Sequence, residues 1–180
     1  MVTYYQKMKK YIVLLLAVMA VSFVSVSCSS DDDVDYSQEY NRTNKEKGEL
    51  FLALNRDSAG VKETYTGLQY RVETLGKGIR PDANDSVYIS YVAMLVDGTV
   101  FESGKYGFEM ENLIAGMREG LQLMPEGSVF HLYIPYYLAY NTASKQTVFN
   151  GKIVSVSAYS ALHYYIKLNK VTSISEAPEI

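Results

Sequence analysis

The chain of 180 residues is poor in the side chains that carry most enzyme chemistry, with one cysteine, two histidines and no tryptophan. A single cysteine excludes an intramolecular disulfide. His131 and His163 are scattered in the sequence and the one cysteine is expected to carry lipid, so these residues do not make a zinc site. The motifs G-x-S-x-G and H-E-x-x-H and the P-loop are also absent. We therefore expect no metal, no cofactor and no nucleophile activated by a base, and we expect both histidines to be solvated strand residues.

Positive charge is also scarce. The chain has 17 basic and 20 acidic residues, and three of the basic ones, Lys7, Lys9 and Lys10, precede an apolar run at the N-terminus. Removal of residues 1–27 moves the net charge from −3 to about −6. Because a nucleic-acid-binding protein needs a basic face, we exclude nucleic acid as a partner.

Residues 1–27 have the features of a lipoprotein signal peptide. The lysines are followed by YIVLLLAVMAVSFVSV, which ends in small residues before Cys28. This pattern is typical of a cleaved signal and not of a stable membrane span. Cys28 resembles the cysteine of bacterial lipoproteins that is lipidated and becomes the new N-terminus. The alternative is a chance unpaired cysteine in a signal peptide. The first interpretation predicts a membrane anchor on Cys28.

Residues 28–37 contain SSDDDVD and predict an acidic tether. The segment resembles the acidic export signal of surface lipoproteins in Bacteroides-like bacteria, and it is equally typical of a solvated spacer. Residues 38–66 predict a lead-in helix and linker. In that helix Leu50, Phe51 and Leu54 lie on one side and are expected to dock on the body of the protein.

Residues 67–172 predict a single α+β domain, because alternating apolar residues indicate an antiparallel sheet and one helical repeat lies near its centre. Asp97-Gly98 separates two alternating runs and predicts a tight hairpin turn. Residues 141–160 are polar and are expected to form a long loop, and residues 173–180 a C-terminal tail. The strands are expected near 68–73, 86–96, 100–103, 129–134 and 162–171, and the helix near 114–124.

Cis–trans isomerisation of X–Pro bonds suits a protein without nucleophile, metal or base. The reaction changes no covalent bond, and its barrier of about 18–20 kcal/mol is the loss of amide resonance. A dry apolar pocket stabilises the twisted amide relative to the planar one, because charge separation falls as the amide twists. Such a pocket needs aromatic walls and a few hydrogen-bonding groups for the flanking carbonyls.

Four sequence blocks resemble the FKBP-type peptidyl-prolyl cis-trans isomerases, the tacrolimus-binding family. They are GLQY, Y-x-x-x-L-x-DGTVFES, LIAGMREGLQLMPEG and YIPYYLAY, and the similarity runs from Gly67 to Val171. The resemblance implies a curved antiparallel sheet wrapped on one short helix. The segment 46–66 resembles the N-terminal extension of the periplasmic and surface members.

The resemblance also implies the site. Tyr91 and Tyr164 match strand aromatics of the family's pocket, and Ile114 matches the residue whose backbone N–H binds a ligand carbonyl. Tyr140 matches the tyrosine whose hydroxyl binds the next carbonyl. The implied catalytic residues are Tyr91, Phe101, Glu102, Ile114, Tyr140 and Tyr164, and the implied substrate-binding residues are Tyr106, Leu113, Met117 and Val156.

The sequence departs from the family pattern at four places. Glu102 replaces an aspartate, Met117 replaces a large aromatic residue at the pocket floor, and Asn141 replaces a glycine where a positive φ is expected. The motif IPP of the last loop is replaced by Val156-Ser157-Ala158, and the loop is longer. These changes bear on catalysis and on substrate preference.

Three functions remain open. The first is a prolyl isomerase that assists folding of proline-containing extracytoplasmic proteins, held in the cell envelope by its lipid anchor. The second is a catalytically weak FKBP-like chaperone or partner-binding module. The third is a glycan-binding lipoprotein, suggested by 17 tyrosines, which requires exposed rings in a shallow groove. The single lead-in helix favours a monomer.

Overall fold

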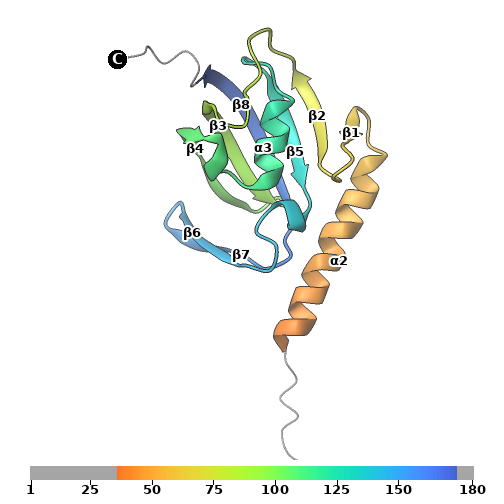
Figure 1. The fold of residues 1–180 in the computed structure, drawn as a ribbon. Helices are drawn as coiled ribbons and strands as arrows, with labels where there is room; N and C mark the ends of the chain where they lie inside the picture. The colour runs from red at the N-terminus through yellow and green to blue at the C-terminus, as the bar shows by residue number, and fades with distance from the viewer. Residues whose placement is uncertain (1–35, 174–180) are drawn as a thin grey trace, which may run out of the picture. The chain divides into compact units, whose positions relative to one another are not determined.

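The computed structural model describes residues 36–173 (Figure 1). The predicted signal peptide, the lipid-bearing Cys28, nearly all of the acidic tether and all but the first residue of the tail lie outside the described residues. None of the helices within residues 36–173 is long and apolar enough to cross a membrane. The elements are α2 (Tyr36–Arg56), β1 (Val61–Glu63), β2 (Gln69–Thr74), β3 (Ser86–Leu95), β4 (Val100–Glu109), η1 (Met110–Asn112), α3 (Ala115–Gln122), β5 (Val129–Ile134), η2 (Tyr136–Leu138), β6 (Lys145–Phe149), β7 (Lys152–Val156) and β8 (Leu162–Thr172).

The main sheet has six strands in the order β1-β2-β5-β8-β3-β4, and every neighbouring pair is antiparallel. Alternation of apolar residues sets which face is buried: Val87, Ile89, Tyr91 and Ala93 of β3 are all buried. The predicted turn joins β3 to β4, and Gly98 supplies the positive φ of 87°. The α+β class is therefore confirmed.

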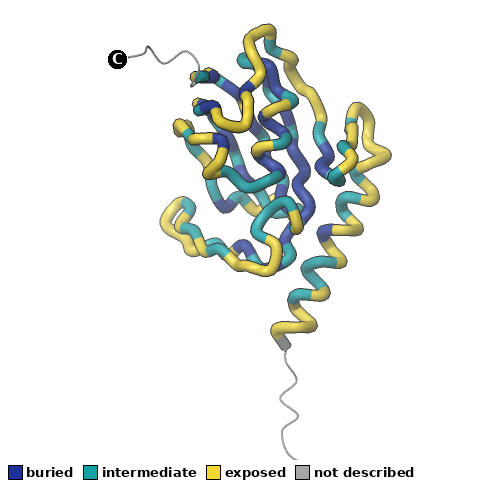
Figure 2. The backbone as a smooth tube through the Cα atoms, in the orientation of Figure 1, coloured by how far each residue is buried: buried dark blue, intermediate teal, exposed yellow. Residues whose placement is uncertain are grey.

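The helix α3 crosses one face of this sheet, and the dark blue segments of Figure 2 gather where the two meet. Two glycines allow the close approach. A Cβ on Gly116 would lie 2.4 Å from Ile134, and a Cβ on Gly120 would lie 2.3 Å from Leu132. The buried Leu121 completes the apolar side of α3. The core therefore lies between α3 and the central strands.

The lead-in helix α2 docks differently from the prediction. Leu50 and Leu54 are 62% and 68% exposed, so their predicted docking was wrong, whereas the ring of Phe51 packs 6.0 Å from that of Tyr133. The buried Gly48 brings the helix close to the segment before β8. Polar contacts complete the docking: Asn44 donates to the Ala158 carbonyl at 2.6 Å, and Asn55 donates to Gln69 at 2.8 Å.

The predicted loop at 141–160 is also wrong in part, because it contains the hairpin β6–β7. Asn150 and Gly151 form its turn with φ of 50° and 75°. Positive φ at both central residues is what a two-residue hairpin requires. The hairpin packs against the edge strand β4 without pairing to it, and the Thr147 hydroxyl donates to the Phe101 carbonyl at 2.6 Å.

Candidate substrate-binding site

A cavity of about 230 Å³ opens between α3, the strands β3, β4 and β8, and the start of β6. Seven of the ten predicted pocket residues line it, and they come from five separate parts of the fold. The cavity also includes four residues that the sequence analysis missed. The lining residues are Ile89, Tyr91, Glu102, Phe108, Asn112, Leu113, Ile114, Met117, Tyr140, Lys145 and Tyr164.

Aromatic rings form one side of the cavity. Tyr91 and Tyr164 are nearly buried, and their ring centroids lie 6.1 Å apart. Phe101 is fully buried behind them and meets Tyr164 edge-to-face at 6.2 Å, so it supports the wall without lining the cavity. Phe108 lines the cavity 6.1 Å from Tyr91. Edge-to-face and tilted ring pairs are favourable arrangements that hold such a wall rigid.

Two other predicted residues, Tyr106 and Val156, do not line the cavity. Tyr106 is 53% exposed and reaches the site through its ring contacts with Tyr91 at 6.4 Å and with Phe108 at 6.2 Å. Val156 is fully buried at the end of β7. Both residues therefore act on the cavity only through their neighbours.

The floor and one rim come from the start of α3. Met117 is 3% exposed and lines the cavity, so it fills the place for which the resemblance implies a larger aromatic. Ile114 is the N-cap of α3, and its carbonyl accepts from the N–H of Met117. The first N–H groups of a helix have no partner within the helix. The Ile114 N–H at the rim is therefore suited to bind a ligand carbonyl.

A polar wall adjoins the aromatic one and is built around Glu102. The Tyr91 hydroxyl donates to Glu102 Oε1 at 2.5 Å, and the Lys145 ammonium donates to Glu102 Oε2 at 2.8 Å. Lys145 also donates to the Tyr140 hydroxyl oxygen at 3.2 Å. The extra methylene of Glu102, compared with aspartate, therefore leaves both carboxylate oxygens engaged.

These contacts keep the ion pair charged. Burial acts to raise the pKa of Glu102, but the hydrogen bonds from Lys145 and Tyr91 outweigh it, so the pKa lies below its usual value. Burial acts to lower the pKa of Lys145, and the contact with Glu102 reverses this and raises it. Burial and the Glu102 carboxylate raise the pKa of Tyr91. At neutral pH Glu102 is anionic, Lys145 is cationic and Tyr91 is a neutral donor.

The backbone after Tyr140 follows the expectation for a substituted glycine. Asn141 has a φ of 55°, in the left-handed region. Its N–H donates to the Tyr136 carbonyl at 2.9 Å, and its own carbonyl accepts from the Tyr159 N–H at 2.7 Å. Asparagine tolerates this conformation better than other non-glycine residues. Asn141 thus holds the turn that carries Tyr140 to the cavity.

The two histidines lie outside this site, and the prediction that they are solvated is only partly right, because both side chains are half-buried. His131 Nδ1 and His163 Nε2 lie 2.9 Å apart, and His131 Nε2 lies 3.2 Å from Glu73. The side chain of His131 is only 14% exposed. Within residues 36–173 no three histidine, cysteine or acidic side chains are grouped to hold a metal ion.

Lys145 is the main residue that sequence analysis missed. The Asn150-Gly151 dipeptide is a strong hairpin signal and would have placed β6 and β7 in the sequence. Nothing in the sequence indicates that Lys145 meets Glu102, 43 residues earlier. Ile89 carries a clearer signal, because it alternates in phase with the buried Val87, Tyr91 and Ala93 of β3. Phe108 carries no such signal, because it is out of phase with Phe101, the one buried residue of β4.

Comparison with known proteins fits this geometry. Residues 77–169 match the family described as FKBP-type peptidyl-prolyl cis-trans isomerase, and residues 26–72 match the domain amino-terminal to it. A probable isomerase FkpA from Neisseria meningitidis is 37% identical over 142 residues, which cover 76% of this chain and 50% of that protein. The macrophage infectivity potentiator of Trypanosoma cruzi is 31% identical over 161 residues, covering 86% and 79%.

Solved structures of this family have a similar fold. The crystal structure of FkpA from Escherichia coli has a TM-score of 0.68 at 29% identity, covering 76% of this chain and 62% of that one. A peptidyl-prolyl cis-trans isomerase from Pseudomonas syringae has a TM-score of 0.66 at 28% identity, covering 74% and 96%. The predicted curved antiparallel sheet with one short helix and a lead-in helix is thereby confirmed. The chain spans about half the length of the Neisseria relative, and it belongs to the FKBP-type peptidyl-prolyl cis-trans isomerase family.

Proposed function

We propose that this chain catalyses cis–trans isomerisation of X–Pro bonds in proline-containing proteins of the cell envelope. The observation that carries the proposal is the cavity itself. It combines a rigid aromatic wall, the Met117 floor, and hydrogen-bonding groups from Ile114 and Tyr140 at its edge. A prolyl ring fits a cavity of about 230 Å³ with room for the adjoining amide.

In this proposal the prolyl ring packs on Tyr91 and Tyr164 above Met117, and water is excluded from the amide that twists. Less charge is separated across the twisted amide, so an apolar surrounding favours it over the planar ground state. The Ile114 N–H and the Tyr140 hydroxyl bind the carbonyls that flank the reacting bond. They hold the chain on both sides while the bond between them rotates.

The polar wall has a supporting part in this mechanism. Glu102 accepts from Tyr91 and Lys145, so both oxygens are occupied before substrate arrives. The carboxylate therefore fixes the Tyr91 ring without competing for the substrate carbonyls. The roles of Phe101 and Tyr106 are to pack behind and beside the aromatic wall.

We further propose that residues 1–27 are removed as a signal peptide, that Cys28 carries the lipid anchor, and that residues 28–37 tether the folded domain to the membrane. The sequence pattern at Cys28 supports the anchor. A relative from Legionella longbeachae, 40% identical over 116 residues, is named an outer membrane protein. This supports a place in the cell envelope. We also propose that the protein is a lipoprotein of the form found in Bacteroides-like bacteria and that it is a monomer, as the single lead-in helix favours.

The isomerase is tested with residues 30–180, which include every residue that the structure describes. Cis-to-trans isomerisation of Ala-Xaa-Pro-Phe peptides is measured with and without tacrolimus. We expect acceleration that tacrolimus inhibits. Tyr140→Phe, which removes one hydroxyl from the cavity, is expected to lower kcat/KM roughly fivefold, and Tyr88→Phe, on the exposed face of β3, to leave it unchanged.

A folded wild-type protein that does not exceed the uncatalysed rate would refute the isomerase. Equal activity of Tyr140→Phe and Tyr88→Phe would show that Tyr140 has no part in catalysis.

The second candidate function is a chaperone or partner-binding module, and one observation favours it. The hairpin next to the cavity exposes Val148 and Ile153, which are cross-strand partners and 72% and 73% exposed. Exposed apolar pairs of this kind bind apolar segments of other chains. Suppression of aggregation of a denatured client, lost in Val148→Ser/Ile153→Ser, without any isomerase activity, would favour this function over the first.

A further inference from the structure

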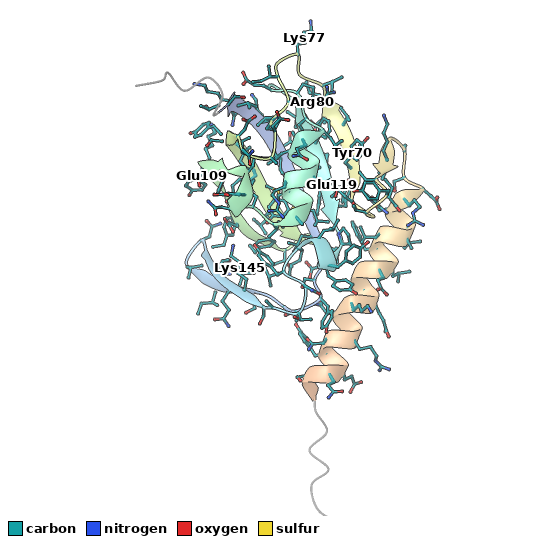
Figure 3. All side chains as sticks on the ribbon, in the orientation of Figure 1. Tyr70, Lys77, Arg80, Glu109, Glu119 and Lys145 are labelled. Atoms are coloured by element: carbon teal, nitrogen blue, oxygen red, sulfur yellow. The ribbon has the colours of Figure 1, made fainter. Side chains whose placement is uncertain are left out.

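Lys145 occupies an unusual place in the site, because it comes from the hairpin β6–β7 and not from the main sheet. Its ammonium lies between the hairpin and the sheet (Figure 3), 2.8 Å from Glu102 Oε2 and 3.2 Å from the Tyr140 hydroxyl. It also lies 5.4 Å from the centre of the Tyr140 ring. One side chain thus contacts both polar groups of the cavity wall.

The chemistry of the ammonium fixes the direction of these contacts. A lysine ammonium donates hydrogen bonds and accepts none, so the Tyr140 oxygen must be the acceptor. The Tyr140 hydrogen is then free to be donated to another group. A hydroxyl that accepts from a cation is also a stronger donor, since hydrogen bonds in a chain polarise one another.

The same contact governs Glu102. A carboxylate that is half-buried beside aromatic rings needs a partner for each oxygen. The Tyr91 hydroxyl donates to Oε1, and the Lys145 ammonium donates to Oε2. Without the ammonium, Oε2 has no cationic partner among the described residues, and the carboxylate is free to rotate away from Tyr91 or to take up a proton.

We propose that Lys145 is a positioning residue for the isomerase: it directs the Tyr140 hydroxyl toward the substrate carbonyl and holds the Glu102 carboxylate on Tyr91. The proposal rests on the proposed function of the cavity. It makes the hairpin part of the catalytic site, although the hairpin supplies no group that touches the prolyl ring.

The test compares Lys145→Met with Lys145→Arg and Lys152→Met. Methionine keeps the length of the side chain and removes the charge, arginine keeps the charge, and Lys152 is an exposed lysine of the same hairpin. We expect Lys145→Met to lower kcat/KM about tenfold, as for loss of a charged hydrogen bond. Lys145→Arg should restore most of the activity, and Lys152→Met should match the wild type. Thermal unfolding of all four proteins verifies that each is folded.

The pH dependence separates positioning from packing. In the wild type the pKa of Glu102 lies below its usual value despite burial, because of Lys145 and Tyr91. Burial raises the pKa of Glu102, and in Lys145→Met only the hydrogen bond from Tyr91 still lowers it. Glu102 therefore takes up a proton at a higher pH in this variant. The ratio of kcat/KM for Lys145→Met to that of the wild type should therefore fall further from pH 7 to pH 5. The titratable groups lining the cavity are Tyr91 of β3, Glu102 of β4, Tyr140 after η2, Lys145 of β6 and Tyr164 of β8, and none comes from α3.

The histidines titrate in both proteins and cancel in the ratio. Wild-type activity in Lys145→Met at both pH values would overturn the proposal. So would a loss that is independent of pH and is not restored by arginine, since that result indicates packing alone.

If the wild type shows no catalysis, the proposed isomerase function is refuted, but the proposed role of Lys145 can still be tested. Binding of the same peptide, followed by NMR titration, then tests Lys145. Weaker binding by Lys145→Met than by Lys152→Met supports the positioning of Tyr140, and equal binding overturns it.

Discussion

The pair of histidines on the face of the sheet opposite α3 predicts that the protein loses stability in mildly acidic solution. Each ring contacts the other, and the ring of His163 stacks on that of Tyr133 with centroids 4.6 Å apart. Burial, followed by the neighbouring His131 and by Arg71, lowers the pKa of His163 to about 4. Burial also lowers the pKa of His131, and its contact with Glu73 offsets this only in part.

The sign follows from which state binds the proton. A histidine in the unfolded chain has a pKa of about 6.5, so the unfolded state takes up a proton before the folded state does. The stabilising effect is complete above pH 6.5, falls as the pH drops, and is fully lost below about pH 4. A difference of about 2.5 in pKa corresponds to about 3 kcal/mol. Solvent screening at the partly exposed ring of His163 roughly halves this value.

We therefore expect the free energy of unfolding to fall by roughly 1 kcal/mol between pH 7 and pH 5 on account of His163. The window is suitable because most carboxylates titrate below it and because the chain has only two histidines. The measurement is urea unfolding of tag-free residues 30–180 at several pH values. In His163→Gln the slope of stability with pH should be much smaller.

His131→Gln serves as the matched control, since it removes the less perturbed member of the pair. It should flatten the slope less than His163→Gln does. A wild-type stability that is the same at pH 7 and pH 5, or an unchanged slope in His163→Gln, would refute the assignment of a half-buried neutral imidazole at this position.

Three further changes test how the elements are held together, each by chemical unfolding. Gly120→Ala places a Cβ 2.3 Å from the buried Leu132 and should destabilise the protein by about 1–3 kcal/mol; an unchanged midpoint would mean that α3 moves freely on the sheet. Gly67→Ala combines a φ of 90° with a Cβ 2.3 Å from the Tyr137 hydroxyl, and a loss of about 1–3 kcal/mol is expected; stability equal to that of wild type would argue against this backbone geometry. Asn44→Ala removes bonds to the Ala158 carbonyl and the Ser160 hydroxyl and should lower stability by about 1–2 kcal/mol, which a neutral result would contradict.

Alternation was sufficient to predict the central strands and α3. β3 and β8 are half-buried along their length, so a period of two in the sequence corresponds directly to burial of one face. Gly98 marks the turn between β3 and β4 because its φ of 87° is unfavourable for most other residues. Where one face is core and the other is solvent, the local pattern determines the element.

The apolar pattern of the sequence predicted burial wrongly where another part of the chain covers the surface. The outward phase of β5 and β8 predicted solvent at His131 and His163, but these side chains cover one another and Phe51 of α2 packs on the adjacent Tyr133. The apolar stripe of α2 predicted docking through Leu50, Phe51 and Leu54, but only Phe51 packs on the sheet. The other docking contacts come from a buried glycine and two asparagines. Close approach and polar contacts leave no apolar period in the sequence.

The candidate site has an apolar half and a polar half, and only the apolar half could be predicted fully from the sequence. The apolar half of the site consists of residues that also belong to the hydrophobic core, such as Tyr91, Met117 and Tyr164. For these residues the apolar pattern of the sequence and the family resemblance predict the same positions. The polar half depends on Lys145, which reaches Glu102 only because the Asn150-Gly151 turn folds the hairpin against β4. We therefore expect the prolyl pocket itself to behave as in other members of the family. Sensitivity to pH and to changes at the rim should instead depend on the hairpin, because the hairpin supplies Lys145, the positive charge of this site.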